Sequence, residues 1–240
     1  MSNTVPVRSR PDGALRDITL ETGVAPYAEG SCMITAGRTR VLCTATVQEA
    51  VPEWRRNSGA GWVTAEYAML PRSTHTRTSR ERGRISGRTQ EIQRLIGRAL
   101  RACMNLEALG ERQILIDCDV IVADGGTRTA SITGAAIALR QACDWLVREG
   151  RIPASPMREF VAAVSVGMFA GQVRVDLDYQ EDVAADVDMN IVALEGGGLV
   201  EVQGTAEHNC FSRGQLDAML NAGLAGIEQL LQFQRNAVRP

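Results

Sequence analysis

The sequence predicts an α+β fold with mixed sheets and helices packed on them. Two observations predict this class. Alternating or β-branched strand patterns occur in groups, and strong helical periodicity is confined to three segments. Along the chain the order is strands, helix, strand, helix, strands, helix, which leaves room for two halves packed back to back.

The first part of the chain is predicted to be mainly β. Residues 1–14 are polar and are expected to form a loosely held arm. Leu15 to Thr22 alternates as a strand, and residues 32–47 have the pattern of a hairpin. Trp62 to Leu70 alternates again, and Pro71 is expected to end that strand.

Three segments have the spacing of helices. Arg88 to Leu109 carries one apolar stripe and stops at Gly110. A second helix is expected to begin near Thr127 and to stop at Gly150, and a third to begin with Ser212 as its N-cap.

The remaining strands lie between these helices. A buried strand is predicted around residues 114–122, because β-branched residues recur there. After a linker with two prolines at 151–156, residues 160–178 are expected to form a second hairpin. A third hairpin turns at Gly196-Gly197-Gly198.

Composition limits the class of protein. With 240 residues, 45% hydrophobic and only 4% aromatic, the chain fits one large domain or two fused halves with an aliphatic core. No apolar run approaches the 18 or more residues of a membrane span, and residues 1–10 lack the apolar centre of a signal peptide. Six scattered cysteines without a CxxC motif are expected to be reduced thiols in a cytoplasmic protein.

Charge is unevenly distributed. Nine arginines lie between residues 71 and 101 against two glutamates, whereas residues 176–207 hold nine acids and no base. Residues 71–87 lack apolar periodicity and are predicted to form an exposed, arginine-rich loop, either a solvated charge run or a binding site for a nucleic-acid backbone. We assign Arg72, Arg77 and Arg80 to RNA binding.

A phosphate site is predicted where the central strand enters the second helix. The residues Asp124-Gly125-Gly126 strongly favour a turn, and Arg128 follows in the first turn of the predicted helix. The unpaired N–H groups at that helix start, together with Arg128, could hold a phosphate, although an ordinary strand-turn-helix would have a similar pattern. Arg88, in the first turn of another helix, opposes the helix dipole by roughly 0.3–1 kcal/mol unless an anion lies between them.

An acidic segment supplies the second half of a candidate site. Asp178 to Asp188 holds five acids in eleven residues. Such a cluster is stable as a solvated surface loop, when one carboxyl keeps its proton, or when a divalent cation such as Mg²⁺ binds among the oxygens. No GxxxxGK[ST] motif is present, and two histidines offer no plausible nucleophile triad.

Long runs of the chain resemble one known family, that of bacterial ribonuclease PH. These runs are GWVTAEYAMLPRSTHTR, GRTQEIQRLIGRALR, DCDVIVADGGTRTASITGA, VAAVSVGMF, DVDMNIV and EVQGTAE. The resemblance implies a phosphorolytic 3′-to-5′ exoribonuclease that trims tRNA 3′ ends with orthophosphate as co-substrate. It also implies a single domain over residues 1–240 with a ribosomal-protein-S5-domain-2-like fold, in a homohexameric ring built as a trimer of dimers.

The resemblance also implies roles for particular residues. The family's phosphate-binding positions fall on Arg88 and on Gly126-Thr127-Arg128. Its catalytic or metal-holding aspartates, with Mg²⁺ as the expected ion, fall on Asp182 and Asp188.

Two other functions fit parts of this pattern. A catalytically silent RNA-binding ring subunit would be expected to lose the phosphate arginines or the acids, and this chain retains both. A metal-dependent hydrolytic nuclease would use the same acids but would release nucleoside monophosphates.

Overall fold

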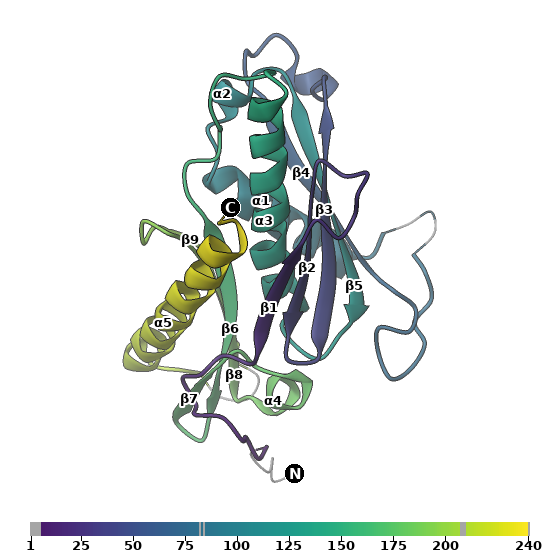
Figure 1. The fold of residues 1–240 in the computed structure, drawn as a ribbon. Coiled ribbons are helices and arrows are strands. Elements are labelled where there is room, and N and C mark those ends of the chain that lie inside the picture. The colour runs from purple at the N-terminus through teal and green to yellow at the C-terminus, as the bar shows by residue number, and fades with distance from the viewer. Residues whose placement is uncertain (1–5, 82, 84, 207–209, 240) are drawn as a thin grey trace.

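Two β-sheets form the frame of the protein (Figure 1). The computed structural model describes residues 6–81, 83, 85–206 and 210–239. Arg82 and Arg84 of the arginine-rich loop therefore lie outside the described residues.

The first sheet has five strands in the order β1-β2-β3-β5-β4. Its β4 runs parallel to β5 while the other neighbours are antiparallel, so the sheet is mixed. The strands are β1 (Ile18–Thr22), β2 (Gly30–Ala36), β3 (Thr39–Gln48), β4 (Trp62–Met69) and β5 (Gln113–Val122).

The second sheet has four antiparallel strands in the order β7-β6-β8-β9. Its central strand β6 is buried along its whole length because helices cover both of its faces. The strands are β6 (Val161–Phe169), β7 (Gln172–Val175), β8 (Val187–Leu194) and β9 (Leu199–Ala206).

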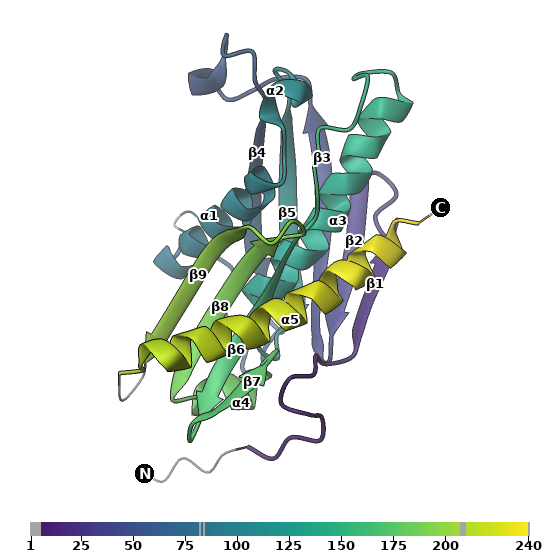
Figure 2. The same cartoon turned by 90° about the vertical axis from the view of Figure 1, so that its left-hand side faces the viewer.

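Helices fill the space between the sheets and cover the outer face of the second one. The α-helices are α1 (Gly87–Ala102), α2 (Leu106–Leu109), α3 (Thr127–Arg148), α4 (Tyr179–Ala184) and α5 (Arg213–Ala237), with one 3-10 turn, η1 (Glu53–Arg55). Central α3 contacts β2 and β3 on one side and β6 on the other, while α5 crosses the opposite face of β6 (Figure 2). Among the described residues, no helix is long and apolar enough to cross a membrane.

Small residues allow α3 to lie close to both sheets. A Cβ on Gly30 of β2 would lie 2.0 Å from the Ala138 carbonyl oxygen, far inside van der Waals contact. On the other side, Thr133 Oγ1 of α3 accepts a hydrogen bond from the Ala163 amide of β6 at 3.2 Å. The Ala-rich and Gly-containing sequence of α3 is therefore what lets one helix serve as core for two sheets.

The structure confirms the α+β class and most predicted elements, including Ser212, which accepts a hydrogen bond from Gln215 N as N-cap of α5. The single helix predicted over Arg88–Leu109 was wrong. The chain leaves the helix after Ala102 because Asn105 N donates to the Pro156 carbonyl and then caps the short α2. Tertiary hydrogen bonds thus interrupt a continuous apolar stripe.

Two segments are more ordered than their composition indicates. Residues 179–184, expected within an acidic cluster, form α4, and Asp178 and Glu181 make a reciprocal capping box at its start. In residues 6–14, the described part of the N-terminal arm that was expected to be loosely held, Arg8 Nε lies 2.9 Å from the buried Glu181 carboxylate, and Val175 N donates to the Asp12 carbonyl.

Candidate active site

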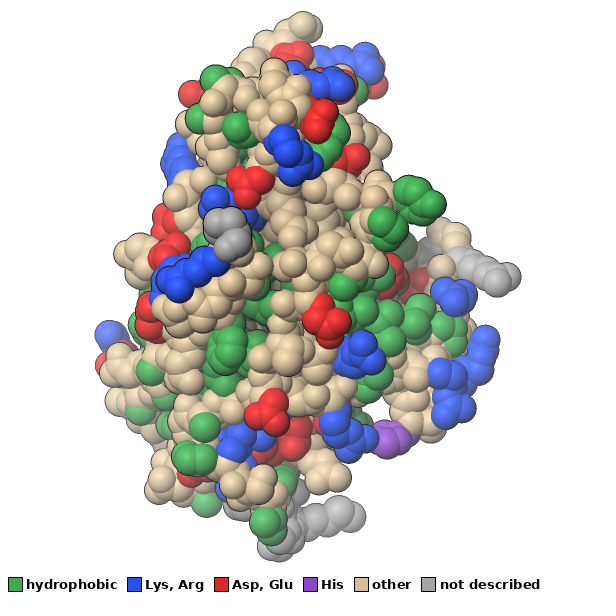
Figure 3. All heavy atoms as spheres, in the orientation of Figure 1, with side chains coloured by type: hydrophobic (Ala, Val, Ile, Leu, Met, Phe, Trp, Pro, Cys, Tyr) green, Lys and Arg blue, Asp and Glu red, His purple; other side chains and the backbone are tan. Residues whose placement is uncertain are grey.

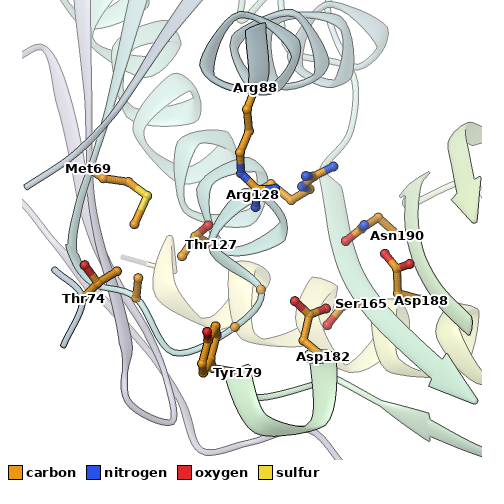
Figure 4. Close-up of a pocket in the computed structure, with 13 residues that line it drawn as sticks. Met69, Thr74, Arg88, Thr127, Arg128, Ser165, Tyr179, Asp182, Asp188 and Asn190 are labelled. Atoms are coloured by element: carbon orange, nitrogen blue, oxygen red, sulfur yellow. The ribbon is translucent and has the colours of Figure 1, made fainter. Parts of the chain in front are cut away.

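One cavity of about 230 Å³ brings together every residue assigned to phosphate binding or catalysis (Figure 4). It lies where the ends of β4 and β5 meet the starts of α1 and α3 and the acidic segment of the second sheet. The full lining is Met69, Thr74, Arg88, Ala123, Gly125, Gly126, Thr127, Arg128, Ser165, Tyr179, Asp182, Asp188 and Asn190.

The start of α3 presents unpaired backbone donors to this cavity. Gly125 and Gly126 have φ angles of +78° and +64°, so the turn uses a backbone region that favours glycine. Side chains cap the other four α-helices, whereas within the described residues α3 begins at Gly126 without a side-chain cap. An uncapped helix start beside a cavity favours an anionic ligand, because its N–H groups carry partial positive charge.

Two arginines border this helix start. Arg88 extends from the first turn of α1 towards Thr127 (Figure 4). Arg128 donates to Gln203 Oε1 at 3.0 Å and to Glu91 Oε1 at 3.2 Å, so its position is fixed by α1 and β9. The Thr127 hydroxyl shares a hydrogen bond of 2.9 Å with the Tyr67 hydroxyl of β4. Cations and donors from three elements, α1, α3 and β4, therefore surround the turn.

The two assigned carboxylates occupy the other side of the cavity. Asp182 extends from α4 and Asp188 from β8, and their oxygens face the same space beside Ser165 and Asn190 (Figure 4). Burial raises the pKa of Asp182, and the neighbouring Asp188 charge raises it further, while Arg128 and Arg88 oppose the shift. A carboxyl with a raised pKa beside a second carboxylate is suited to proton transfer or to holding a cation.

The carboxylates fit a magnesium ion only if the substrate completes its coordination. Among the described residues, no group of three or more His, Cys, Asp or Glu side chains could hold a metal. Mg²⁺, however, is commonly bound by one or two carboxylates together with substrate phosphates and water. Asp182 and Asp188 offer that arrangement.

The arginines assigned to RNA binding do not line this cavity. Arg80 lines an adjacent cavity of about 340 Å³, which shares Met69 and Arg88 with the first. Basic side chains gather over the loop after β4, at the right-hand edge of Figure 3. The loop begins at the site, because Thr74 lines the first cavity and Ala123 N donates to the Ser73 carbonyl.

Several residues of the site were missed at the sequence level. Tyr67 and Ser165 sit in strands whose patterns mark them only as sheet residues. The buried ion pair of Arg16 and Asp176 lies behind the glycine turn, with 2.7 Å between Arg16 Nη2 and Asp176 Oδ1. Partners 160 positions apart leave no local signal, whereas the spacing Asp178-x-x-Glu181 could have indicated the capped start of α4.

Known proteins match this chain over most of its length. Residues 14–143 match the model of the 3′ exoribonuclease family, domain 1, and residues 159–226 match domain 2 of that family. Ribonuclease PH of Methylorubrum populi is 60% identical over 227 residues, covering 94% of this chain and 96% of that protein. Ribonuclease PH of a Methylobacterium species is 58% identical over 235 residues, covering 97% and 99%.

Solved structures share the fold at much lower identity. The Archaeoglobus fulgidus exosome with RNA bound to the active site has a TM-score of 0.80 at 19% identity, covering 93% of this chain and 90% of that chain. Rice Rrp46 has a TM-score of 0.78 at 17% identity, covering 96% and 99%. The family models and the relatives near 60% identity show the family: the chain belongs to the ribonuclease PH family of 3′ exoribonucleases.

Proposed function

We propose that this protein shortens RNA from its 3′ end by phosphorolysis in the cavity between α1, α3, α4 and β8. An oxygen of orthophosphate bonds to the phosphorus of the last phosphodiester. The bond from that phosphorus to the 3′-oxygen of the preceding ribose breaks, and a nucleoside 5′-diphosphate leaves. The freed 3′-oxygen takes a proton.

Orthophosphate would be held at the start of α3. Arg88, Arg128, the Thr127 hydroxyl and the amides at Gly126 supply charge and hydrogen-bond donors from fixed elements. Because phosphoryl transfer depends mainly on positioning and charge stabilisation, these groups would align the attacking oxygen and offset charge in the transition state.

The carboxylates would act on the leaving side of the reaction. A raised pKa makes the protonated form of Asp182 more populated, and that form can donate to the departing 3′-oxygen. Alternatively, Mg²⁺ held by ionised Asp182 and Asp188 together with substrate oxygens would supply Lewis-acid stabilisation of the same leaving group.

The family of 3′ exoribonucleases and the arginine-rich loop, residues 71–87, both indicate RNA as the substrate. We infer that Arg72, Arg77 and Arg80 bind the body of a structured RNA such as tRNA, while its 3′ end enters the cavity. We also propose that residues 1–240 form a single domain and that six copies of the chain assemble into the homohexameric ring of the family. Five buried, unpaired cysteines fit a cytoplasmic protein, because thiols stay reduced there.

The convergence of two arginines, an open helix start and two carboxylates around one cavity carries this proposal. The test is to incubate 3′-extended tRNA with the protein, with and without orthophosphate, and to identify the products. Nucleoside diphosphates that require orthophosphate are expected. Monophosphates formed without orthophosphate would identify a hydrolytic nuclease, and RNA binding without any product would identify a silent ring subunit.

A further inference from the structure

A buried arginine, Arg16, makes hydrogen bonds to the glycine turn, Asp124-Gly125-Gly126, at the start of α3. Arg16 lies just before β1, and its side chain is only 6% exposed. Its guanidinium donates to the Asp124 carbonyl at 2.8 Å and to the Gly125 carbonyl at 3.4 Å. A Cβ added to Gly126 would lie 2.9 Å from Arg16 Nη2, so the arginine lies directly against the turn.

Because peptide bonds are planar, contacts to the turn carbonyls also determine the direction of the N–H groups of Gly125 and Gly126. In a trans peptide, the carbonyl of one residue and the N–H of the next point in opposite directions, and the described residues contain no cis peptide bond. Because the carbonyls of Asp124 and Gly125 point to Arg16, the N–H groups of Gly125 and Gly126 point away from it. Those two glycines line the cavity, and neither amide donates to a backbone carbonyl of the described residues.

Thr39 makes the same contact independently. Its hydroxyl donates to the Gly125 carbonyl at 2.7 Å and accepts from Asp124 N at 3.0 Å. The Thr39 side chain is fully buried at the start of β3, on a different strand from the one that follows Arg16. The Gly125 carbonyl therefore accepts from two side chains, Arg16 and Thr39, and the Asp124 carbonyl accepts from Arg16.

The partner of Arg16 links the turn to the carboxylate side of the site. Asp176 accepts from Arg16 N at 2.8 Å and from Arg16 Nε at 3.0 Å through Oδ2, in addition to the ion pair through Oδ1. Burial alone would raise the pKa of Asp176, but the Arg16 hydrogen bonds and charge hold that pKa below its usual value. Two residues later, Asp178 caps α4, the helix that carries Asp182.

We propose that Arg16 is a positioning residue, which directs the Gly125 and Gly126 amides towards orthophosphate and, through Asp176, fixes the turn relative to α4. Arg16 does not line the cavity, so we expect no direct contact between Arg16 and orthophosphate. This inference rests on the proposed phosphorolysis, because it assigns how the phosphate subsite of that reaction is held in shape.

The first test compares two conservative variants. Arg16→Lys keeps the charge but replaces the three spaced nitrogens of the guanidinium, which contact Asp176 and the turn carbonyls, with a single nitrogen. Its matched control is Arg101→Lys, because Arg101 also donates to a backbone carbonyl, Val63 O at 2.8 Å, yet lies at the opposite end of α1. We expect the phosphate KM to rise roughly tenfold in Arg16→Lys with kcat changed much less, and to stay normal in Arg101→Lys.

The second test uses Thr39, so that the result does not depend on how well Arg16→Lys folds. Thr39→Val keeps the shape of the side chain and removes the hydroxyl, whereas Thr39→Ser keeps the hydroxyl. The affinity of the RNA-free protein for inorganic phosphate, measured by calorimetry, is expected to fall in Thr39→Val and to be retained in Thr39→Ser.

The outcomes separate this inference from the proposed function. Wild-type phosphate affinity and KM in folded Thr39→Val, with the same in any folded Arg16→Lys, would overturn the positioning role while leaving phosphorolysis in place. Equal losses in Thr39→Ser and Thr39→Val would also overturn it, because the hydroxyl would then not be responsible. A wild-type protein whose products do not depend on orthophosphate would overturn the proposed function and this inference with it.

Discussion

The guanidinium of Arg128 lies 3.2 Å from the carboxylate of Glu91, so the first turn of α3 is joined to α1 beside the cavity. Arg128 is only 15% exposed, and Gln203 of β9 accepts from the same nitrogen. Such contacts reduce the number of side-chain conformations that must be given up when a ligand binds. The pair therefore preorganises Arg128 for a phosphate at the glycine turn.

Replacing Arg128 with Ala should raise the phosphate KM by about ten- to a hundredfold, the effect of losing one charge-assisted hydrogen bond of roughly 1.5–3 kcal/mol. RNA affinity should stay nearly unchanged, since the residue is assigned to phosphate. Initial rates against orthophosphate concentration, with RNA binding measured separately, test this. Glu91→Gln is the companion variant, and a smaller rise in KM is expected there. An unchanged phosphate dependence in Arg128→Ala would remove Arg128 from the site.

Asp188→Asn should lower kcat by at least about a hundredfold while phosphate and RNA affinities persist, because the carboxylate is assigned a role in the transition state. Single-turnover rates with saturating RNA and phosphate measure the chemical step directly. Near-normal turnover would show that the carboxylate has only a structural role.

Asp182→Asn should stabilise the fold at neutral pH when phosphate and Mg²⁺ are absent. Because the folded-state pKa of Asp182 is raised, ionisation is less favourable in the folded state, and stability is lost as pH rises through that pKa. Below the unfolded pKa the carboxyl is protonated in both states, so the advantage of the variant should disappear in acid. Melting temperatures of both proteins across pH 3 to 8 test the sign, with Asp217→Asn, at a half-exposed carboxylate paired with Arg213, as a control. A difference that grows in acid would contradict the assignment.

Gly125→Ala should lower both stability and turnover more than the same change at Gly150. Both glycines have positive φ angles, +78° and +65°, so each alanine adds backbone strain of about 1–2 kcal/mol. Only at Gly125 would the new Cβ also collide with backbone, 2.5 Å from the Asp178 carbonyl carbon, because α4 begins against the turn. Melting temperature and kcat of the two variants separate strain from displacement of α4. Equal effects at both positions would argue against a tight turn-to-α4 contact.

Replacing Arg72, Arg77 and Arg80 together should weaken tRNA binding and flatten its salt dependence. The slope of log affinity against log salt concentration should fall by about 0.9 for each duplex phosphate that is no longer neutralised. Short single-stranded oligomers that cannot reach the loop should be degraded almost as before. The ratio of the two activities decides the result. If tRNA and a short oligomer lose activity in equal proportion, or neither does, the loop is a solvated charge run.

The features that were predicted correctly from the sequence depend on residues only a few positions apart. The glycine turn before α3 and the Ser212 cap of α5 were found because turn and cap residues act within a few positions. The break of the helix after Ala102 was missed because its cause, the Pro156 carbonyl, lies more than 50 positions away. For the same reason the pairing of Arg16 with Asp176 has no sequence pattern, although it lies directly behind the site. The periodicity of apolar residues thus predicts which segments form helices and strands. Polar contacts between residues far apart in the sequence determine where those elements end and how they pack.

The position of α3 has a consequence for how the protein can be divided. The family models split the chain near residue 150, and α3 falls almost wholly in the first part, yet it packs against β6 of the second. Likewise α5, at the end of the second part, contacts β1 at the start of the first. Either fragment made alone would expose apolar surface that the intact chain buries, so heating should melt the whole chain in one cooperative transition, with no separately stable half.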